Sequence, residues 1–320
     1  MKIEKIINAL RAHKTFLIST HVNPDPDALS SEVALASFLR SEGKKVYIVN
    51  EGAVPSRYSF MPGVKSIRAY DKRKKIRYDA AIIIDCGDLG RIGKVQKLID
   101  RDSFLINIDH HVTSEHFGDL NLVRPKASST AEILFDLLSR AGFQFTRNVA
   151  VNLYIGIMTD TGSFRYENTT SRTHEIISQL MKFNFSIPKL YQKLYETISL
   201  NSLKTFSEVV KSFDSLDQGR TIVVELPKSV LSRFGDDIDL RDEIFRFFRK
   251  IKEVEVIAIF TEMGWRMTRV NFRSQRHVDV AKLANHFGGG GHRRASGCMI
   301  RDDIEGAKRK VLAKIRKMLR

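Results

Sequence analysis

The stretch Thr20-His21-Val22-Asn23-Pro24-Asp25-Pro26-Asp27-Ala28 follows the apolar run Phe16-Leu17-Ile18-Ser19 and precedes a helix-forming segment. This pattern predicts a loop between a buried strand and a helix. In an α/β sheet, ligands bind in the crevice outside the carboxyl ends of the strands. His21, Asp25 and Asp27 could hold a divalent ion there, since prolines restrict the backbone on both sides of Asp25. For this loop alone, the simpler alternative is a polar turn in which an Asp caps the helix.

Two further strands are predicted to end in candidate ligands. The continuous apolar run 79–84 is typical of a strand buried on both faces, and Asp85 follows it. A second run, 103–108, leads directly to Asp109-His110-His111. Because the carboxyl ends of parallel strands lie at one edge of a sheet, we expect these side chains to meet those of the first loop. Taken separately, Asp85 could cap a following helix, and the two histidines could form a surface turn.

A fourth candidate carboxylate, Asp160, ends the apolar and helix-like segment that begins at Asn148. A negative charge at the C-terminus of a helix opposes the helix dipole unless a cation compensates it. The position therefore favours a metal site over a structural role for Asp160.

The remaining pattern predicts two α/β regions of unequal size. Strand-like and helix-like segments alternate over the first half, which is typical of a mainly parallel sheet. From 171 to 213 the pattern is helical, and a second set of strands and helices follows it. We therefore predict an N-terminal catalytic domain over 1–185, a helical linker over 186–217 and a smaller C-terminal domain over 218–320.

Composition limits the classes of protein that the sequence can represent. The 320 residues are 42% hydrophobic and 28% charged, which suits a globular chain large enough for two cores. No apolar run reaches the ~18 residues of a membrane span, and the start lacks the apolar core of a secretion signal, so we expect a cytoplasmic protein without a membrane partner. Cys86 and Cys298 are isolated, which indicates neither a disulfide framework nor a cysteine zinc site.

Positive charge suggests a polyanionic partner. The net charge of +16 fits a nucleotide or nucleic acid, and it fits a Lys/Arg-rich solvated surface about equally well. The run Gly288-Gly289-Gly290-Gly291-His292 could bring backbone N–H groups close to a phosphate, since glycine permits positive φ. A flexible loop is the alternative. Arg273, which ends a predicted strand, and the two arginines after His292 favour an anion-binding loop.

The candidate ligands together indicate a chemistry. One His and four Asp with a further His pair form an oxygen-rich set, which suits Mn²⁺ or Mg²⁺ more than zinc. The carboxylates are too many for one ion, so we expect two ions about 3.5–4 Å apart that share a carboxylate and activate a water. Such a pair favours in-line displacement at phosphorus. Because the sequence contains neither a Ser-centred nucleophile elbow nor a P-loop, phosphate ester hydrolysis is the matching reaction.

These motifs resemble those of a DHH-family phosphoesterase of the NrnA type, the nanoRNase and pAp phosphatase group, over nearly the whole chain. The segment 288–297 resembles the DHH-associated C-terminal domain of that family. The resemblance implies that Asp85 bridges two divalent cations, with Mn²⁺ expected first and Mg²⁺ or Co²⁺ as alternatives. One ion would be held by His21, Asp25 and Asp85, and the other by Asp27, Asp85, His110 and Asp160.

The resemblance also implies roles outside the metal ligands. His111 would contact the scissile phosphate or protonate the leaving group, and Asp109 would orient the pair. The C-terminal domain would bind the distal phosphate and nucleotide of the substrate, and the chain would form a homodimer. The implied substrate-binding residues are Arg273, Ser274, Gly289, Gly290, Gly291 and His292. Three departures from the family pattern, Ser30, Arg124 and Ser296, touch no implied metal ligand, although Arg124 could alter substrate preference.

The implied activity is hydrolysis of short oligoribonucleotides and linear dinucleotides such as pApA to mononucleotides, with cyclic di-AMP as a further candidate. The family also converts 3′-phosphoadenosine 5′-phosphate (pAp) to AMP. Alternatives are a RecJ-like single-strand exonuclease, a manganese inorganic pyrophosphatase and a non-catalytic nucleotide sensor. The exonuclease would need extra nucleic-acid-binding modules, the pyrophosphatase lacks the glycine-rich loop, and the full ligand set argues against a silent sensor.

Overall fold

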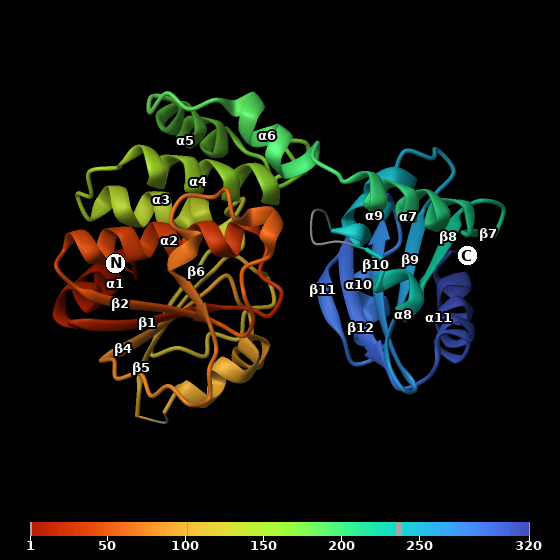
Figure 1. Ribbon diagram of the computed structural model, residues 1–320, viewed down its shortest axis with the longest axis horizontal. Helices are drawn as coiled ribbons and strands as arrows, with labels where there is room; N and C mark the ends of the chain where they lie inside the picture. Colours follow the sequence, from red (N-terminus) through yellow and green to blue (C-terminus); the bar gives the residue numbers. More distant parts are fainter. Residues whose placement is uncertain (1, 101, 235–238, 320) are drawn as a thin grey trace. The chain divides into compact units, whose positions relative to one another are not determined.

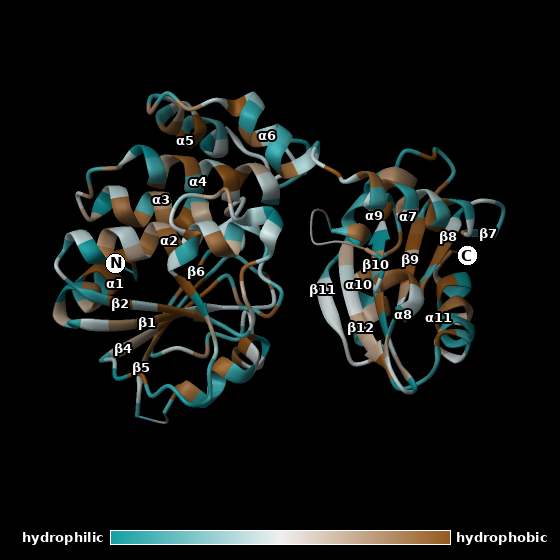
Figure 2. Ribbon diagram, viewed as in Figure 1, coloured by the Kyte–Doolittle hydropathy of each residue, from teal (hydrophilic) through white to brown (hydrophobic). Residues whose placement is uncertain are grey.

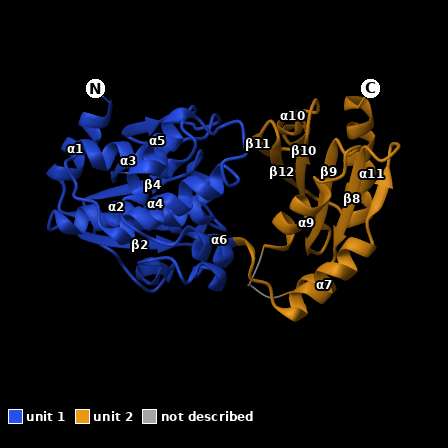
Figure 3. Ribbon diagram, turned by 90° about the horizontal axis from the view of Figure 1, so that it is seen from above, with its two compact units in different colours: residues 1–194 blue, residues 195–320 orange. Residues whose placement is uncertain are grey.

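The computed structural model describes residues 2–100, 102–234 and 239–319, and the chain divides into two compact units, Met1–Leu194 and Tyr195–Arg320 (Figure 3). Helices α6 (Ile187–Tyr195) and α7 (Leu200–Lys211) lie in the stretch expected to be a helical linker. The division into a catalytic domain, a linker and a substrate-binding domain stays a prediction.

The first unit contains a six-stranded sheet in which every neighbouring pair of strands is parallel, as the alternating pattern predicted. Its order is β3-β2-β1-β4-β5-β6. The strands are β1 (Thr15–Thr20), β2 (Lys45–Asn50), β3 (Ile67–Ala69), β4 (Ala80–Ile84), β5 (Phe104–Asp109) and β6 (Leu120–Val123). All of β4 is buried, which confirms that its continuous apolar run marks a strand covered on both faces.

Helices cover both faces of this sheet. Helices α2, α3 and α4 stack on one face, with α5 packed against α3 and α4, and η3 packs on the other face (Figure 1). The α-helices are α1 (Lys2–Ala12), α2 (Pro26–Ser41), α3 (Thr130–Arg140), α4 (Arg147–Asp160) and α5 (Ser171–Met181). The 3₁₀ helices are η1 (Ser56–Tyr58), η2 (Val64–Ser66) and η3 (Leu89–Leu98).

The strand order reverses between β1 and β4. From β1 the chain proceeds outward to β2 and β3, then returns to β4 and proceeds to β5 and β6 on the other side. Thr20 and Ile84, the last residues of β1 and β4, are register partners. Such a switch point leaves a crevice at the carboxyl ends of the two strands. His21 and Asp85 follow these ends directly, so the topology itself brings the first and second candidate loops together.

The second unit is built on a mixed sheet of order β11-β12-β10-β9-β8-β7, in which the β8–β9 pair is parallel and the other pairs are antiparallel. Helices α10 and α11 pack on one face and α7 and α9 on the other, and the central strand β9 is largely hydrophobic (Figure 2). The strands are β7 (Asp214–Leu216), β8 (Thr221–Leu226), β9 (Val256–Gly264), β10 (Met267–Ser274), β11 (Gly290–His292) and β12 (Ala295–Ile300). The helices are α8 (Lys228–Leu231), α9 (Leu240–Phe248), α10 (Val280–Asn285) and α11 (Ile304–Met318).

The expectation of a loop over the glycine run is wrong for part of it. Residues 290–292 form strand β11, which pairs with β12. A Cβ on Gly289 would come within 2.2 Å of the Gly297 carbonyl oxygen, and one on Gly291 within 2.6 Å of the Ala295 carbonyl oxygen. These two glycines therefore allow neighbouring backbones to approach closely. The sequence of the glycine run alone does not distinguish this role from that of a mobile loop.

Both cysteines are buried and unpaired in the part of the chain that the structure describes. Burial raises the pKa of Cys86 to about 12 and that of Cys298 to about 11, so both thiols stay protonated near neutral pH. Across the described ranges, no helix has the length and apolar character that spanning a bilayer requires.

Candidate metal centre

The loop after β1 both caps a helix and presents ligands. Asp25 is the N-cap of α2, and its Oδ1 accepts a hydrogen bond of 3.0 Å from the Ala28 N–H. Its other oxygen, Oδ2, lies 4.0 Å from His21 Nε2. Pro26 occupies the first turn of the helix, where a missing N–H costs nothing. Because the two carboxylate oxygens point at different partners, capping does not exclude a role for Asp25 at an ion.

Asp27 is held by the N-terminus of a different helix. Its side chain is buried, with Oδ2 accepting from the Thr130 N–H at 2.8 Å and Oδ1 from the Ala131 N–H at 3.0 Å. These donors are in the first turn of α3, where the helix dipole also favours a carboxylate. Burial, followed by the charges of Asp85 and Asp160, still raises the pKa of Asp27 well above its ordinary value. The crowding of carboxylates would be relieved by a cation.

Asp85 lies between the two halves of the centre. Only 2% of the residue is exposed, and its φ of 54° places it in the left-handed region, which Asp tolerates better than most residues. Its Oδ2 lies 3.7 Å from His21 Nε2, whereas its Oδ1 lies 3.6 Å from His110 Nε2. Oδ1 also accepts a 2.8 Å hydrogen bond from the Thr130 hydroxyl. One oxygen thus faces each histidine, which is the arrangement that a carboxylate shared by two ions requires.

The capping role that Asp85 could have taken belongs to Asp88. The Asp88 side chain is the N-cap of η3 and accepts from the Gly90 N–H at 2.7 Å. Burial raises the pKa of Asp85, but the imidazole of His21 close to its Oδ2 and the charges of the neighbouring histidines outweigh it, so the net pKa is well below its usual range. Asp85 therefore stays ionised near neutral pH.

His21 and His110 share one arrangement of their ring nitrogens. His21 Nδ1 lies 2.9 Å from the Val22 carbonyl oxygen, and His110 Nδ1 lies 3.4 Å from that of Ala127. A carbonyl oxygen can only accept, so it fixes the proton on Nδ1 and leaves Nε2 directed at the carboxylates. Burial lowers the pKa of His21, but the nearby carboxylates of Asp85 and Asp25 outweigh it and raise that pKa to about 9.

His111 is oriented by the end of β5. Asp109 is fully buried, and its Oδ1 accepts from the His111 backbone N–H at 3.1 Å and from the His111 Nδ1 at 2.7 Å. Burial raises the pKa of Asp109, but the hydrogen bond and charge of His111 lower it further, so the net shift is downward. A carboxylate that fixes the Nδ1 proton leaves Nε2 as the proton-exchanging atom of the ring.

The candidate ligands form overlapping groups. Donor atoms of His21, Asp25 and Asp85 lie within 4.8 Å of one another, as do those of Asp27, His110 and Asp160, and those of Asp85, His110 and His111. Carboxylate and imidazole donors at these separations are placed to bind divalent metal ions. All six residues expected as ligands thus meet at one edge of the sheet.

Two residues that the sequence analysis did not select support this centre. Thr130 donates its hydroxyl to Asp85 and its N–H to Asp27. Asn168 donates to the Ser128 carbonyl oxygen at 2.8 Å and to that of Asp160 at 3.2 Å, and so joins the end of α4 to the start of α3. Ser129 is the N-cap of this helix, and nothing in the sequence around it indicated that the same turn would contact both Asp27 and Asp85.

In the second unit, Arg273 and His292 lie in one row across the sheet. Both are register partners of Ala295, Arg273 on β10 and His292 on β11. Opposite residues of antiparallel strands share a face, so the two side chains flank a small residue about two strand spacings, or ~10 Å, apart. Arg273 also lies over the Phe245 ring, 4.7 Å from its centroid. The next row on that face contains Gly290, Gly297 and Asn271. Its two glycines, called the glycine floor below, carry no side chain.

The rest of the predicted substrate cradle lies beside this row. Ser274 ends β10, and its N–H donates to the Arg294 carbonyl oxygen at 3.1 Å. The structure brings Ser274, Gly290, Gly291 and His292 to the same end of the sheet as Arg273. Their binding role stays a prediction.

Comparisons with known proteins agree with this architecture. Residues 15–157 match the DHH family, N-terminal domain, and residues 236–320 match the DHHA1 domain. The probable bifunctional oligoribonuclease and PAP phosphatase NrnA of Streptococcus mutans is 31% identical over 91% of both chains. The Thermus thermophilus bifunctional oligoribonuclease and PAP phosphatase NrnA is 30% identical over 94% of this chain and 89% of its own. An exopolyphosphatase-related protein from Bacteroides fragilis superposes with a TM-score of 0.86 at 28% identity, covering 98% of this chain and 94% of its own.

Proposed function

The chain belongs to the DHH family, and from this premise we propose that it is a metal-dependent hydrolase acting on short oligoribonucleotides and on pAp. The observation that carries the proposal is the placement of Asp85, whose two oxygens face His21 on one side and His110 on the other. The names of the relatives from S. mutans and T. thermophilus supply the substrate classes.

We assign two divalent cations to the centre, with Mn²⁺ first and Mg²⁺ or Co²⁺ as alternatives. Such ions supply an activated water and neutralise charge on the phosphoryl oxygens. The oxygen-rich donor set fits these ions. One set of ligands is His21, Asp25 and Asp85, and the other is Asp27, Asp85, His110 and Asp160, consistent with the groups that the fold brings together.

Residues that are not metal ligands would transfer a proton and bind the substrate. Asp109 holds the His111 Nδ1 proton, so His111 Nε2 is the atom that would contact the scissile phosphate or give a proton to the leaving oxygen. In the second unit, Arg273 and His292 would bind the distal phosphate, and the glycine floor would admit the nucleotide backbone. Ser274 and the backbone of 289–291 complete this cradle.

The proposal extends to the remaining properties expected of this family. Linear dinucleotides such as pApA are the proposed phosphodiester substrates, with cyclic di-AMP as a further one. We propose a homodimer in the cytoplasm. Sedimentation of the purified chain tests the homodimer, and a monomer at micromolar concentration would overturn that part of the proposal.

A panel of substrates tests the activity. With Mn²⁺ present, purified protein is expected to hydrolyse pApA to AMP and pAp to AMP and phosphate, and chelation should abolish both. Rates are compared for pAp, pApA, cyclic di-AMP and RNA of increasing length. Absence of metal-dependent hydrolysis across the panel would support a nucleotide sensor, and undiminished hydrolysis of long single strands would support an exonuclease.

A further inference from the structure

A run of positive charge follows β3 and is used by none of the steps above. Residues 72–77 read Lys-Arg-Lys-Lys-Ile-Arg, with no acidic residue among them. An open pocket of about 560 Å³ lies against this run. The residues that line it, called the basic pocket below, are Tyr70, Asp71, Lys72, Arg73 and Lys94.

The basic pocket lies at the same edge of the sheet as the metal centre. Tyr70 follows the end of β3, and its N–H donates to the carbonyl oxygen of Asn50, the last residue of β2. Strand β2 neighbours β1, which ends just before His21, so Tyr70 is about two strand spacings, or ~10 Å, from that residue. Lys94 belongs to η3, which is tied to the candidate metal loop by a 2.7 Å hydrogen bond from the Val22 N–H to the Arg91 carbonyl oxygen.

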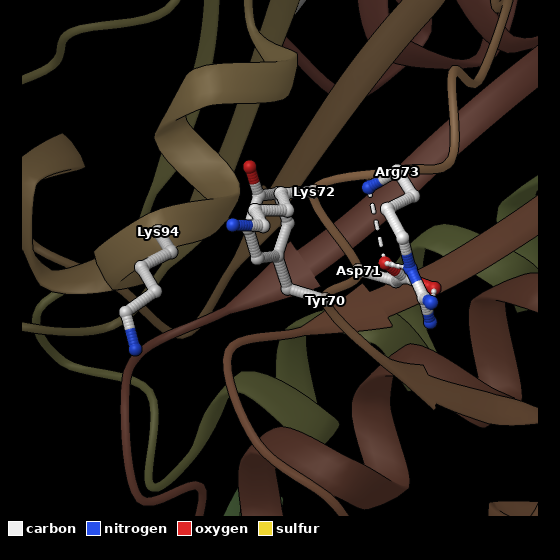
Figure 4. A pocket seen from close by; sticks show the side chains of 5 residues that line it. All are labelled: Tyr70, Asp71, Lys72, Arg73 and Lys94. Carbon is white, nitrogen blue, oxygen red and sulfur yellow. Dashed lines mark hydrogen bonds and ion pairs between the residues drawn. The ribbon is translucent and has the colours of Figure 1, made fainter.

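Three cationic side chains and one aromatic ring line the basic pocket. Lys94 comes from η3, and the other four side chains come from the segment after β3 (Figure 4). Asp71 is occupied within its own turn, because it accepts from the Arg73 backbone N–H and from its guanidinium, at 3.0 and 3.1 Å. Lys94 is 66% exposed and lies 3.7 Å from Glu51 Oε1. Asp71 is thus balanced by Arg73 and Glu51 by Lys94, so Lys72 gives the pocket and its acidic neighbours a net positive charge.

We propose that the basic pocket binds the strand of an oligoribonucleotide beyond the nucleotide at the metal centre, with lysines on phosphates and Tyr70 against one base. This inference rests on the proposed function and adds a second binding site to it. Single-stranded nucleic acids are bound by positive grooves that carry aromatic side chains, and both features are present here. Tyr70 packs against a buried cluster that includes Val49 and Ile92, so its ring is positioned without help from a ligand.

The consequence concerns the length of the substrate. A dinucleotide or pAp offers no strand to reach the basic pocket, whereas a pentamer offers several further phosphates. Contacts to phosphate by lysines make binding depend on salt, with a log–log slope of about 0.7 per phosphate contact for single strands. The basic pocket should therefore raise the affinity for pentamers over dimers and make that affinity more sensitive to salt.

The test compares a pair of variants with a matched control. Lys72→Gln/Lys94→Gln removes two cations from the pocket, and Lys2→Gln/Lys5→Gln removes two from helix α1, which packs beside β6 at the far edge of the sheet. Binding of a labelled A₅ pentamer is followed by fluorescence anisotropy in chelator at several salt concentrations. We expect the pocket variant to bind the pentamer about fivefold to tenfold more weakly, with a salt slope reduced by about 1.4 for two lost contacts.

Hydrolysis of pApA and pAp by the same variant should match that of the unaltered protein. An unchanged pentamer affinity and salt slope in the pocket variant would overturn the inference. An equal loss of pentamer affinity in the α1 control would also overturn it, because it would show that the overall positive charge of the protein binds the RNA and not a specific site. If the unaltered protein fails to hydrolyse pApA, the proposed function fails, and the binding result still decides the basic pocket separately.

The contact with a base is tested by fluorescence. A pentamer with 2-aminopurine at successive positions should be quenched at one internal position by the unaltered protein and by Tyr70→Phe. Tyr70→Leu should lose that quenching. If Tyr70→Leu quenches 2-aminopurine at every position as strongly as the unaltered protein does, no base stacks on this ring.

Discussion

At the scale of single residues, the centre is a set of charges that the metal-free chain accommodates poorly. Burial and neighbouring carboxylates raise the pKa of Asp27 and Asp160, while Asp85 is kept ionised by the histidines around it. Burial lowers the pKa of His21, but the carboxylates of Asp85 and Asp25 outweigh burial and raise that pKa to about 9. In the metal-free protein, the protons on these groups offset the negative charge that a divalent cation would otherwise offset.

The raised pKa of His21 predicts how the stability of the chelated protein depends on pH. The folded value lies above the unfolded value of about 6.5, so the stabilisation is complete below pH 6.5 and is lost as pH rises to about 9. The linkage gives at most roughly 3 kcal/mol. Calorimetric unfolding temperatures at pH 6.5 and 9 should therefore differ by several degrees more in the unaltered protein than in His21→Gln.

The comparison with His21→Gln is needed because Asp27 and Asp160, with raised pKa values, lose stabilisation in the same direction as pH rises. Equal pH dependence in the two proteins would show that His21 carries no raised pKa. Saturating Mn²⁺ should remove most of the difference, since the ion replaces the proton on His21.

At the scale of elements, the first turn of α3 positions several of the candidate ligands. Its N–H groups hold Asp27, its Thr130 hydroxyl holds Asp85, and the Ala127 carbonyl oxygen before it orients His110. Helix α4 lies close against this turn at Gly156, where a Cβ would come within 2.6 Å of Asp27 Oδ1 and 2.7 Å of Ala131 Cβ. The absence of a side chain at Gly156 thus sets how closely α2, α3 and α4 meet.

Gly156→Ala is therefore expected to move α4 away from Asp27. Overpacking of this kind costs about 1–3 kcal/mol, and displacement of Asp27 should lower kcat at least tenfold. The matched control is Gly52→Ala, since no heavy atom lies within 4 Å of a Cβ at Gly52. Measurement of urea unfolding and pApA turnover for both variants checks this, and normal turnover by a folded Gly156→Ala protein would show that Asp27 is not held by this packing.

The sequence predicted those parts of the centre that depend on local order along the chain. Asp85 and Asp109 follow apolar runs, and parallel strands end at one edge, so their meeting could be deduced without coordinates. Thr130 and Asn168 could not be found in this way, because their partners are far away in sequence and depend on how α3 meets α2 and α4. Strand β11 was missed because glycine has little preference for strands, and its pairing is set by the close approach of β12.

At the scale of the whole molecule, the two units supply different parts of the proposed reaction. The first unit holds all the candidate metal ligands, and the second holds the row formed by Arg273, Ala295 and His292. In the proposed reaction, binding energy collected by the second unit would position the reacting phosphorus, so its loss should lower kcat/KM for substrates that carry a distal phosphate. A small activated ester does not use that energy.

Arg273→Ala and His292→Ala are accordingly expected to impair hydrolysis of pApA by about 2–4 kcal/mol in kcat/KM, as for loss of a charged contact to phosphate. Both variants should keep most of their activity on bis-p-nitrophenyl phosphate, which has no distal phosphate. Arg266→Ala, an arginine between β9 and β10 that is 61% exposed and pairs with Asp302, is the matched control and should alter neither rate. Equal damage to both substrates by Arg273→Ala would place Arg273 at the chemical centre.

The central claim is that Asp85 joins two metal ions in one catalytic centre, and calorimetric titration of Mn²⁺ into Asp85→Asn tests it most directly. The unaltered protein is expected to bind two ions per chain and to hydrolyse pApA. Asp85→Asn should keep its fold, judged by circular dichroism, while losing at least one high-affinity ion and nearly all turnover, because an amide cannot supply the shared negative charge. Two tightly bound ions and normal kcat in a folded Asp85→Asn protein would contradict the account.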